Sequence, residues 1–200
     1  MTIFDILFPK KCLECGRNGG YICEVCLAKV PKAAPPGLWE YRGVVRKAIL
    51  ALKYRFAADV AFELGELASQ QIPSQNTVHC LQNTILVPIP LHKKRQNWRG
   101  FNQAEAIGAQ IAKNLGWKYR NDILVRTEAG EPQVGLSKKE RVQNISGKYA
   151  VNNSFRSTDY SSRTVVLFDD VATTGSTLAE AARVLKKAGA KRVVRLTIAG

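Results

Sequence analysis

No stretch of these 200 residues is both long enough and apolar enough to cross a membrane. The opening segment, Met1 to Phe8, is too short for a signal peptide and lacks the flanking residues of one. Acidic residues are scarce, with 16 Asp and Glu against 30 Lys and Arg, so the formal net charge is +14. We therefore expect a cytoplasmic protein without a membrane span, and an anionic partner such as nucleic acid, polyphosphate or a membrane surface.

Cysteine is also rare outside one cluster near the N-terminus. Four of the five cysteines form two Cys-x₂-Cys pairs separated by seven residues, namely Cys12, Cys15, Cys23 and Cys26. A cytosolic chain keeps its thiols reduced, which argues against two disulfides. Four thiolates at this spacing suit tetrahedral Zn²⁺, with an iron–sulfur cluster and redox disulfides as alternatives. Because the protein fills all four positions, we expect a structural zinc site. Cys80 stands apart, and we expect an ordinary buried or loop thiol.

A proline-rich stretch separates this cluster from the rest of the chain. Pro31, Pro35 and Pro36 cannot continue a helix or a central strand, so residues 31–37 are interpreted as a linker. We expect a zinc knuckle with its linker over residues 1–34 and an α/β domain over residues 35–200.

The most informative stretch runs from Thr164 to Gly189. Its first part is a continuous apolar run, 165–168, as expected of a strand covered on both faces. Its last part, from Thr177, has the apolar spacing of a helix. A helix N-terminus offers unpaired N–H groups that suit a phosphate dianion. Hydroxyl donors and a flexible glycine would assist it, from Thr173, Thr174, Gly175, Ser176 and Thr177.

Two aspartates, Asp169 and Asp170, end the strand, at the edge where open α/β sheets bind ligands. Side chains alternate along a strand, so we expect the two carboxylates to point to opposite sides and not to share a proton. They are then suited to a ribose diol or to Mg²⁺. A structural alternative is a capping box, in which Thr177 and Glu180 close the helix start.

The thirteen residues from Val165 to Thr177 resemble the phosphoribosyl pyrophosphate (PRPP) motif of type I phosphoribosyltransferases. The resemblance implies that Asp169 and Asp170 face the ribose hydroxyls. It also implies a 5′-phosphate site formed by Ala172, Thr173, Thr174, Gly175, Ser176 and Thr177.

A second strand, Thr84 to Val87, precedes a strongly basic segment. Five cationic or titratable side chains lie between His92 and Arg99, and a helix with an Asn102–Glu105 capping box follows. Such a segment could hold a pyrophosphate. It could instead bind single-stranded nucleic acid, for which the candidate residues are Lys93, Lys94, Arg95, Trp98 and Arg99. A solvated loop is the structural alternative.

Residues 87–92 (VPIPLH) and 99–105 (RGFNQAE) resemble the signature of the ComF family. Members pair an N-terminal zinc knuckle with a phosphoribosyltransferase domain and are associated with natural competence, the uptake of DNA. On this resemblance the pyrophosphate site consists of Leu91, His92, Arg95, Arg99 and Arg141. The family's pattern is also met by Arg126, Gln133, Leu136, Asn144 and Gly147.

We expect a mainly parallel sheet of about five strands flanked by helices, the type I phosphoribosyltransferase fold, with a small N-terminal zinc knuckle. Further expected strands cover residues 38–45, 122–126, 148–151 and 192–199, and further helices cover 44–54, 60–70 and 137–144. The enzymes that the chain resembles have a mobile hood at the place that residues 127–147 occupy in this sequence.

Three functional hypotheses follow. The first is a PRPP-binding ComF-type protein that acts on incoming single-stranded DNA or its uptake machinery, with structural zinc and with Mg²⁺ beside PRPP. The second is an active phosphoribosyltransferase with a nucleobase, amine or nucleic-acid acceptor. The chain ends at Gly200, which leaves little material for base recognition, and the only candidate base is His92. The third is a non-catalytic module that binds single-stranded nucleic acid.

Overall fold

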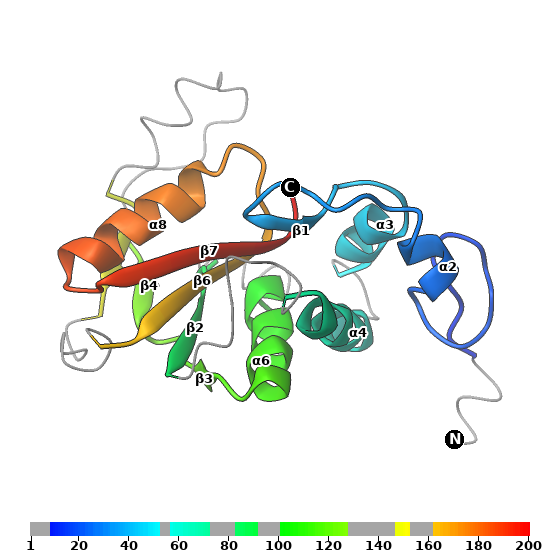
Figure 1. The fold of residues 1–200 in the computed structure, drawn as a ribbon, viewed down its shortest axis with the longest axis horizontal. Helices are drawn as coiled ribbons and strands as arrows, with labels where there is room; N and C mark the ends of the chain where they lie inside the picture. The colour runs from blue at the N-terminus through cyan, green and yellow to red at the C-terminus, as the bar shows by residue number, and fades with distance from the viewer. Residues whose placement is uncertain (1–8, 53–56, 73–82, 92–100, 128–146, 153–161) are drawn as a thin grey trace.

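The computed structural model describes residues 9–52, 57–72, 83–91, 101–127, 147–152 and 162–200 (Figure 1). Its centre is a five-stranded sheet in the order β1-β7-β6-β2-β3, and every pairing in it is parallel. The strands are β1 (Gly37–Trp39), β2 (Thr84–Pro88), β3 (Lys118–Tyr119), β6 (Thr164–Val171) and β7 (Arg192–Ala199). The predicted mainly parallel α/β fold is confirmed.

Helices cover both faces of this sheet (Figure 1). One face carries α8 (Ser176–Lys187), and the other carries α3 (Gly43–Ala51), α4 (Ala57–Gln71) and α6 (Gln103–Leu115). Strand β6 shows why both faces are apolar. Val165 and Leu167 pack with the core under α8, whereas Val166 and Phe168 pack with the core under α6. The uninterrupted apolar run in the sequence therefore reflects a strand buried on two sides.

Two short strands lie outside the main sheet. Strand β4 (Leu124–Arg126) pairs antiparallel with β5 (Tyr149–Val151), and Arg126 lies opposite Tyr149. Leu124 and Tyr149 are buried in the core beneath α8, which anchors the hairpin to that helix. Both strands were predicted, but their pairing with each other was not, because the two strands lie far apart in the sequence.

The N-terminal segment around the cysteines packs against the α4 side of the molecule. It contains one short helix, α2 (Glu24–Leu27), and its buried side chains share a single apolar core with α3, α4 and α6. This shared core includes Cys12, Ile22 and Cys26. The segment is therefore held to the larger domain by burial as well as by the chain connection.

The strand expected over residues 38–45 is wrong in its second half. Strand β1 ends at Trp39, and α3 begins at Gly43, whose φ of +53° turns the chain out of the extended conformation. The short edge strand β3 was not expected from the sequence. A strand of only two residues, Lys118 and Tyr119, is too short to show an alternating pattern in the sequence. It is defined by its pairing with β2.

The starts of α6 and α8 differ in a way that the sequence did not indicate. Asn102 caps α6, since its side-chain oxygen accepts a 3.0 Å hydrogen bond from the N–H of Ala104. In α8 the capping position belongs to Gly175 (φ +69°), without a side-chain cap, and the helix begins at Ser176. The predicted Thr177–Glu180 capping box is therefore wrong. Within the described residues, none of the helices combines the length and apolarity that a membrane crossing requires.

Candidate functional site

A pocket of about 260 Å³ opens at the carboxyl ends of β2 and β6. This is the edge at which open α/β sheets place their ligands. Segments from six parts of the chain line it: Ile89, Pro90, Leu91, Asn102, Gln103, Ala104, Arg126, Lys148, Tyr149, Asp169, Asp170 and Thr177. The pocket therefore combines two carboxylates, two cationic side chains and several neutral polar groups.

The two aspartates both contribute to this pocket. The Oδ1 of Asp169 accepts a 2.9 Å hydrogen bond from the N–H of Asp170, and Asp170 accepts one of 2.8 Å from the N–H of Val171. The pKa of Asp169 lies well above its ordinary value, first because the carboxyl is desolvated and second because Asp170 is negatively charged. Burial and the neighbouring negative charge therefore both favour the protonated form of the Asp169 carboxyl.

Two cationic side chains, Arg126 and Lys148, form what we call the cationic wall of the pocket. Arg126, at the end of β4, lies over the ring of Tyr149 with 5.8 Å between guanidinium carbon and ring centroid. Lys148 precedes Tyr149, and its pKa is lowered, first by burial and then by the charge of Arg126. Two positive groups that face the same partly desolvated space repel each other until an anion enters. This wall can therefore bind an anion in the pocket that the aspartates also line.

The loop between β6 and α8 supplies the hydroxyl groups. Thr177 lines the pocket, whereas residues 172–176 form the partly exposed loop that leads to it. The hydroxyls of Thr174 and Ser176 lie 2.6 Å apart, and the N–H of Ala172 donates to the carbonyl of Ala199 at 2.8 Å. The loop is thus tied to the end of β7. Because α8 lacks a side-chain cap, the N–H groups of its first turn are suited to an anion.

The start of α6 forms the third side of the pocket. The amide of Asn102 donates to the carbonyl of Ile89 at 3.0 Å and to Glu105 at 3.0 Å. Both Asn102 and Gln103 are buried polar residues. One capping side chain therefore joins the end of the β2 segment to the first turn of α6, which gives that part of the pocket a fixed shape.

The four clustered cysteines form a separate site. Their sulfur atoms all lie within 4.8 Å of one another, and the Sγ atoms of Cys15 and Cys23 are 3.7 Å apart. A tetrahedral ion with bonds of about 2.3 Å to sulfur requires sulfurs about 3.8 Å apart. No disulfide joins these four cysteines. They could therefore hold a metal ion such as zinc.

The electrostatics of these thiols favour metal binding at neutral pH. Burial by itself raises the pKa of Cys12, but the backbone N–H groups of Cys15, Cys23 and Glu14 outweigh it and lower the pKa to about 6. Burial, together with the neighbouring thiols, raises the pKa of Cys26 to about 12. Because thiolates are the metal ligands, a bound cation would favour loss of the proton from each of these thiols.

Several predicted site residues lie outside the described residues. They are His92, Lys93, Lys94, Arg95, Trp98, Arg99 and Arg141, together with Cys80 and the predicted helix 137–144. Of the predicted phosphate and pyrophosphate residues, Leu91 and Thr177 lie in the pocket wall beside Asp169 and Asp170.

The sequence did not single out five of the pocket residues for binding: Asn102, Gln103, Arg126, Lys148 and Tyr149. Asn102 was expected only to cap a helix. Arg126 already stood out, because it fits the ComF pattern, but no role followed from it. Lys148 and Tyr149 could have been found only from the pairing of β4 with β5.

The comparison with known proteins agrees with this architecture. Residues 103–199 match the family model of the phosphoribosyl transferase domain. Competence protein F from Haemophilus influenzae is 37% identical over 193 residues, covering 91% of this chain and 81% of that protein. DNA utilization protein YhgH from Escherichia coli (strain K12) is 29% identical, covering 91% of this chain and 80% of that protein.

A more distant relative is competence protein ComFC from Bacillus subtilis, 28% identical over 76% of this chain and 58% of that protein. A glutamine PRPP amidotransferase from B. subtilis aligns with 70% of this chain and 27% of that protein, at 17% identity and a TM-score of 0.46. That score is too low to bear on function. The alignment with competence protein F, by contrast, covers most of both proteins at 37% identity, and the chain belongs to the ComF family.

Proposed function

We propose that this protein binds PRPP with Mg²⁺ and acts in the handling or import of single-stranded DNA during natural transformation. The observation that carries the PRPP assignment is the composition of one pocket. Two carboxylates, Thr177 at the start of α8 and two cationic side chains line the same pocket at the carboxyl end of the sheet. PRPP has a matching layout, with a diol in the middle and an anionic group on each side.

Each part of PRPP has a chemically suitable partner in this arrangement. Asp169 and Asp170 are assigned to the ribose hydroxyls, and residues 172–177 to the 5′-phosphate. Arg126 and Lys148 supply positive charge for the pyrophosphate, next to Leu91. The residues proposed from the family resemblance, His92, Arg95, Arg99 and Arg141, remain part of this assignment.

Magnesium fits the acidic side of the pocket. Asp169 and Asp170 offer hard oxygen ligands, and a cation beside them would offset the burial and the Asp170 charge that raise the pKa of Asp169. When bound, Mg²⁺ supplies positive charge that offsets the pyrophosphate. The protein's own contribution is to hold the sugar between the two charged walls and to limit the access of water.

Zinc is the metal proposed for Cys12, Cys15, Cys23 and Cys26, since the sulfur spacing suits a tetrahedral ion. All four ligands would come from the protein, so its role is structural. We propose that residues 1–34 form this knuckle with its linker and that residues 35–200 form the phosphoribosyltransferase-like domain.

Nucleic acid is proposed as the macromolecular partner, with proteins of the DNA-uptake machinery as further partners. Two relatives are named for competence and for DNA utilization, and the net charge of +14 favours a polyanion. The residues assigned to DNA are Lys93, Lys94, Arg95, Trp98 and Arg99. We place the protein in the cytoplasm, where thiols stay reduced.

Thermal unfolding with and without PRPP and Mg²⁺ tests the PRPP assignment. Ligand at about a hundred times its Kd should stabilise the fold by roughly 2.7 kcal/mol. For a chain of this size the shift in Tm is about 5–10 °C. Asp170→Asn should lose this shift while folding normally. A wild-type protein that shows no shift at millimolar PRPP would refute the assignment.

DNA binding is tested separately by measuring affinity for a single-stranded oligonucleotide as a function of salt. Affinity should fall steeply with salt, because each neutralised phosphate releases counterions. Replacing Lys93, Lys94, Arg95 and Arg99 by Ala together should reduce the slope and weaken binding for every sequence tested. Unchanged binding in that variant would move the DNA site elsewhere.

A further inference from the structure

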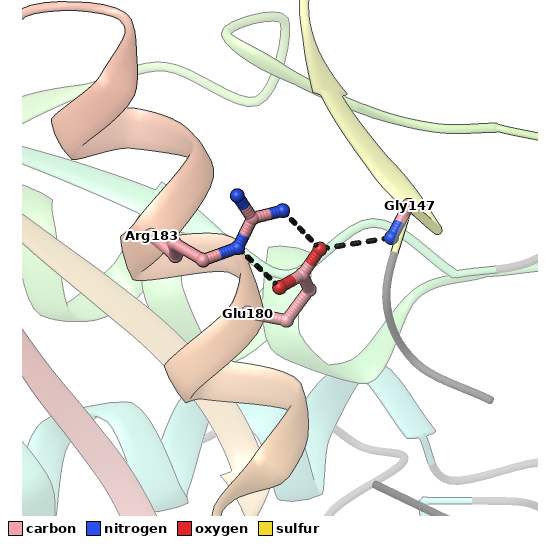
Figure 2. Close-up of polar contacts among 3 residues, drawn as sticks. All are labelled: Gly147, Glu180 and Arg183. Carbon is pink, nitrogen blue, oxygen red and sulfur yellow. Dashed lines mark hydrogen bonds and ion pairs between the residues drawn. The ribbon is translucent and has the colours of Figure 1, made fainter. Parts of the chain in front are cut away.

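Glu180 lies in the first turns of α8, yet it does not cap that helix. Its Oε1 accepts a 2.9 Å hydrogen bond from the backbone N–H of Gly147, which immediately precedes the pocket residue Lys148 (Figure 2). Gly147 has a φ of +80°, a conformation that residues with side chains rarely adopt. A side chain of α8 thus reaches a specific backbone group on the β4–β5 hairpin.

Arg183 fixes the orientation of that carboxylate. Its Nε donates to Oε2 of Glu180 and its Nη2 donates to Oε1, both at 2.8 Å, so the pair is bidentate (Figure 2). The side chain of Glu180 is only 10% exposed. Its pKa is lowered to about 2, first by the hydrogen bonds from Arg183; burial opposes this effect, and the Gly147 N–H adds a smaller lowering contribution. The carboxylate is therefore charged at every physiological pH.

The same short stretch is also held from the β4 side. Thr127 donates from its hydroxyl to the carbonyl of Gly147 at 2.6 Å and from its N–H to the carbonyl of Lys148 at 2.9 Å. Gly147 is therefore bonded on one side to the strand that carries Arg126 and on the other side to α8. Arg126 comes just before Thr127, and Lys148 and Tyr149 come just after Gly147. All three line the pocket.

We propose that Glu180, oriented by Arg183, is a positioning residue for the cationic wall of the PRPP pocket. It holds the base of the β4–β5 hairpin against α8, and so keeps Arg126 and Lys148 in the pocket that Asp169 and Asp170 also line. This inference rests on the proposed PRPP-binding function. The two residues themselves need not touch the ligand, since Arg183 lies on a different cleft that it shares with Tyr149 and Lys187.

Such a device has a physical purpose. Arg126 and Lys148 carry like charges; the pKa of Lys148 is lowered first by burial and then by the charge of Arg126. Without a restraint, the hairpin base would relax and move the two charges apart. Ligand binding would then have to restore the arrangement. The apparent Kd would equal the intrinsic Kd divided by the fraction of molecules that hold the binding arrangement, so it would rise as that fraction falls.

The test compares two ligands in wild type and in Glu180→Gln, by calorimetric titration with Mg²⁺ present. PRPP carries the pyrophosphate that the cationic wall would bind, whereas ribose 5-phosphate lacks it. In Glu180→Gln the Kd for PRPP should rise about tenfold, as expected when one charge-assisted hydrogen bond is lost. The Kd for ribose 5-phosphate should stay within about twofold of wild type. Lys186→Gln, on an exposed position of the same helix, is the matched control and should leave both values unchanged.

Hydrogen exchange provides the structural readout. In Glu180→Gln, and to a smaller extent in Arg183→Gln, the amides of residues 147–151 should exchange faster than in wild type, while those of β6 and β7 keep their rates. If wild type binds PRPP and Glu180→Gln binds it equally well, the positioning role is refuted and the PRPP assignment stands. Equal losses for both ligands would mean a general structural role, which also refutes it. A wild-type protein that binds neither ligand would overturn the proposed function itself.

Discussion

The carboxylate of Glu63, on α4, accepts a 2.7 Å hydrogen bond from the backbone N–H of Ile22, in the turn just before Cys23. Its second oxygen accepts a 2.9 Å bond from the N–H of Tyr21. Two further ion pairs, Lys10 with Asp59 at 3.1 Å and Lys47 with Glu14 at 3.2 Å, span the same contact. The cysteine segment is therefore held against α3 and α4 by the partly buried carboxylate of Glu63. The exposed ion pairs contribute less to the stability of this contact.

Glu63→Ala should lower the free energy of unfolding by about 1–3 kcal/mol, because two backbone N–H groups lose their charged acceptor. Denaturant unfolding followed by fluorescence and far-UV circular dichroism measures this change. Glu63→Gln keeps one acceptor oxygen and should cost clearly less. Lys47→Ala breaks an exposed pair and should cost less than about 1 kcal/mol. Equal values for the Lys47 and Glu63 variants would show that the carboxylate has no special part in docking.

Gly20 offers an independent check of the same contact. A Cβ at this position would lie 2.7 Å from Oε1 of Glu63. Gly20→Ala should therefore destabilise the wild type by displacing the carboxylate, and should have little additional effect in the Glu63→Ala background. Additive losses in this double-mutant cycle would contradict the steric explanation.

Metal removal should destabilise the whole chain and not only the cysteine segment. Cys12 and Cys26 are buried in the same apolar core as Phe168 of β6. A chelator should release one zinc ion per chain, measured with a colorimetric indicator, and should lower the Tm by several degrees. Cys12→Ser should lose the bound zinc, whereas Cys80→Ser, outside the cluster, should retain it. Full zinc content in Cys12→Ser would rule out this ligand set.

The sequence predicted the parallel sheet and the strand–loop–helix order from Thr164 to Gly189 well, because both depend on local patterns. The run Val165 to Phe168 shows a strand buried on two sides, and the residues after it form one continuous motif. The cysteine spacing likewise determines a cluster through short-range chain geometry. In each case the residues that act together lie within about fifteen positions of one another.

The cationic wall could not be predicted in the same way. Arg126 and Lys148 come together only through the pairing of β4 with β5, and nothing in either short strand specifies the other. Glu180 shows the complementary failure. Its position relative to Thr177 fits a capping box, but the bond to Gly147 and the pair with Arg183 outcompete that local arrangement. In both cases a contact with a distant part of the chain, β4 with β5 or Glu180 with Gly147, sets the arrangement.

Thr177→Ala should separate binding from capping. Because Gly175 occupies the capping position of α8, the loss of the Thr177 hydroxyl should change the Tm of the free protein by less than about 1 °C. It should nevertheless weaken the PRPP-induced shift. Asn102→Ala removes a true cap and should cost about 1–2 kcal/mol in unfolding experiments without ligand. A similar loss of stability in both variants would mean that Thr177 does cap its helix.

Asp169→Asn should make the free protein more stable while it weakens ligand binding. The pKa of Asp169 is raised above the ordinary 3.8, by desolvation and then by Asp170, so the folded state holds this proton more tightly than the unfolded chain does. The protonated carboxyl thus favours folding below the unfolded-state pKa, and this contribution is lost as pH rises through the folded-state pKa. At neutral pH the neutral amide should gain about 0.5–2 kcal/mol of stability, as often found when a functional charge is removed.

The measurement is unfolding free energy against pH, from about 4 to 8, for wild type and Asp169→Asn without ligand. The advantage of the variant should grow as pH rises, because only the wild type carries the desolvated charge. With PRPP and Mg²⁺ the order should reverse, since the bound cation makes that charge favourable. Asp122→Asn is the control: Asp122 is an exposed carboxylate paired with Arg120, and its pKa is lowered by that hydrogen bond, so its variant should be slightly less stable at neutral pH. If Asp169→Asn were less stable than wild type throughout this range, the carboxylate would be a structural group rather than one held in readiness for a ligand.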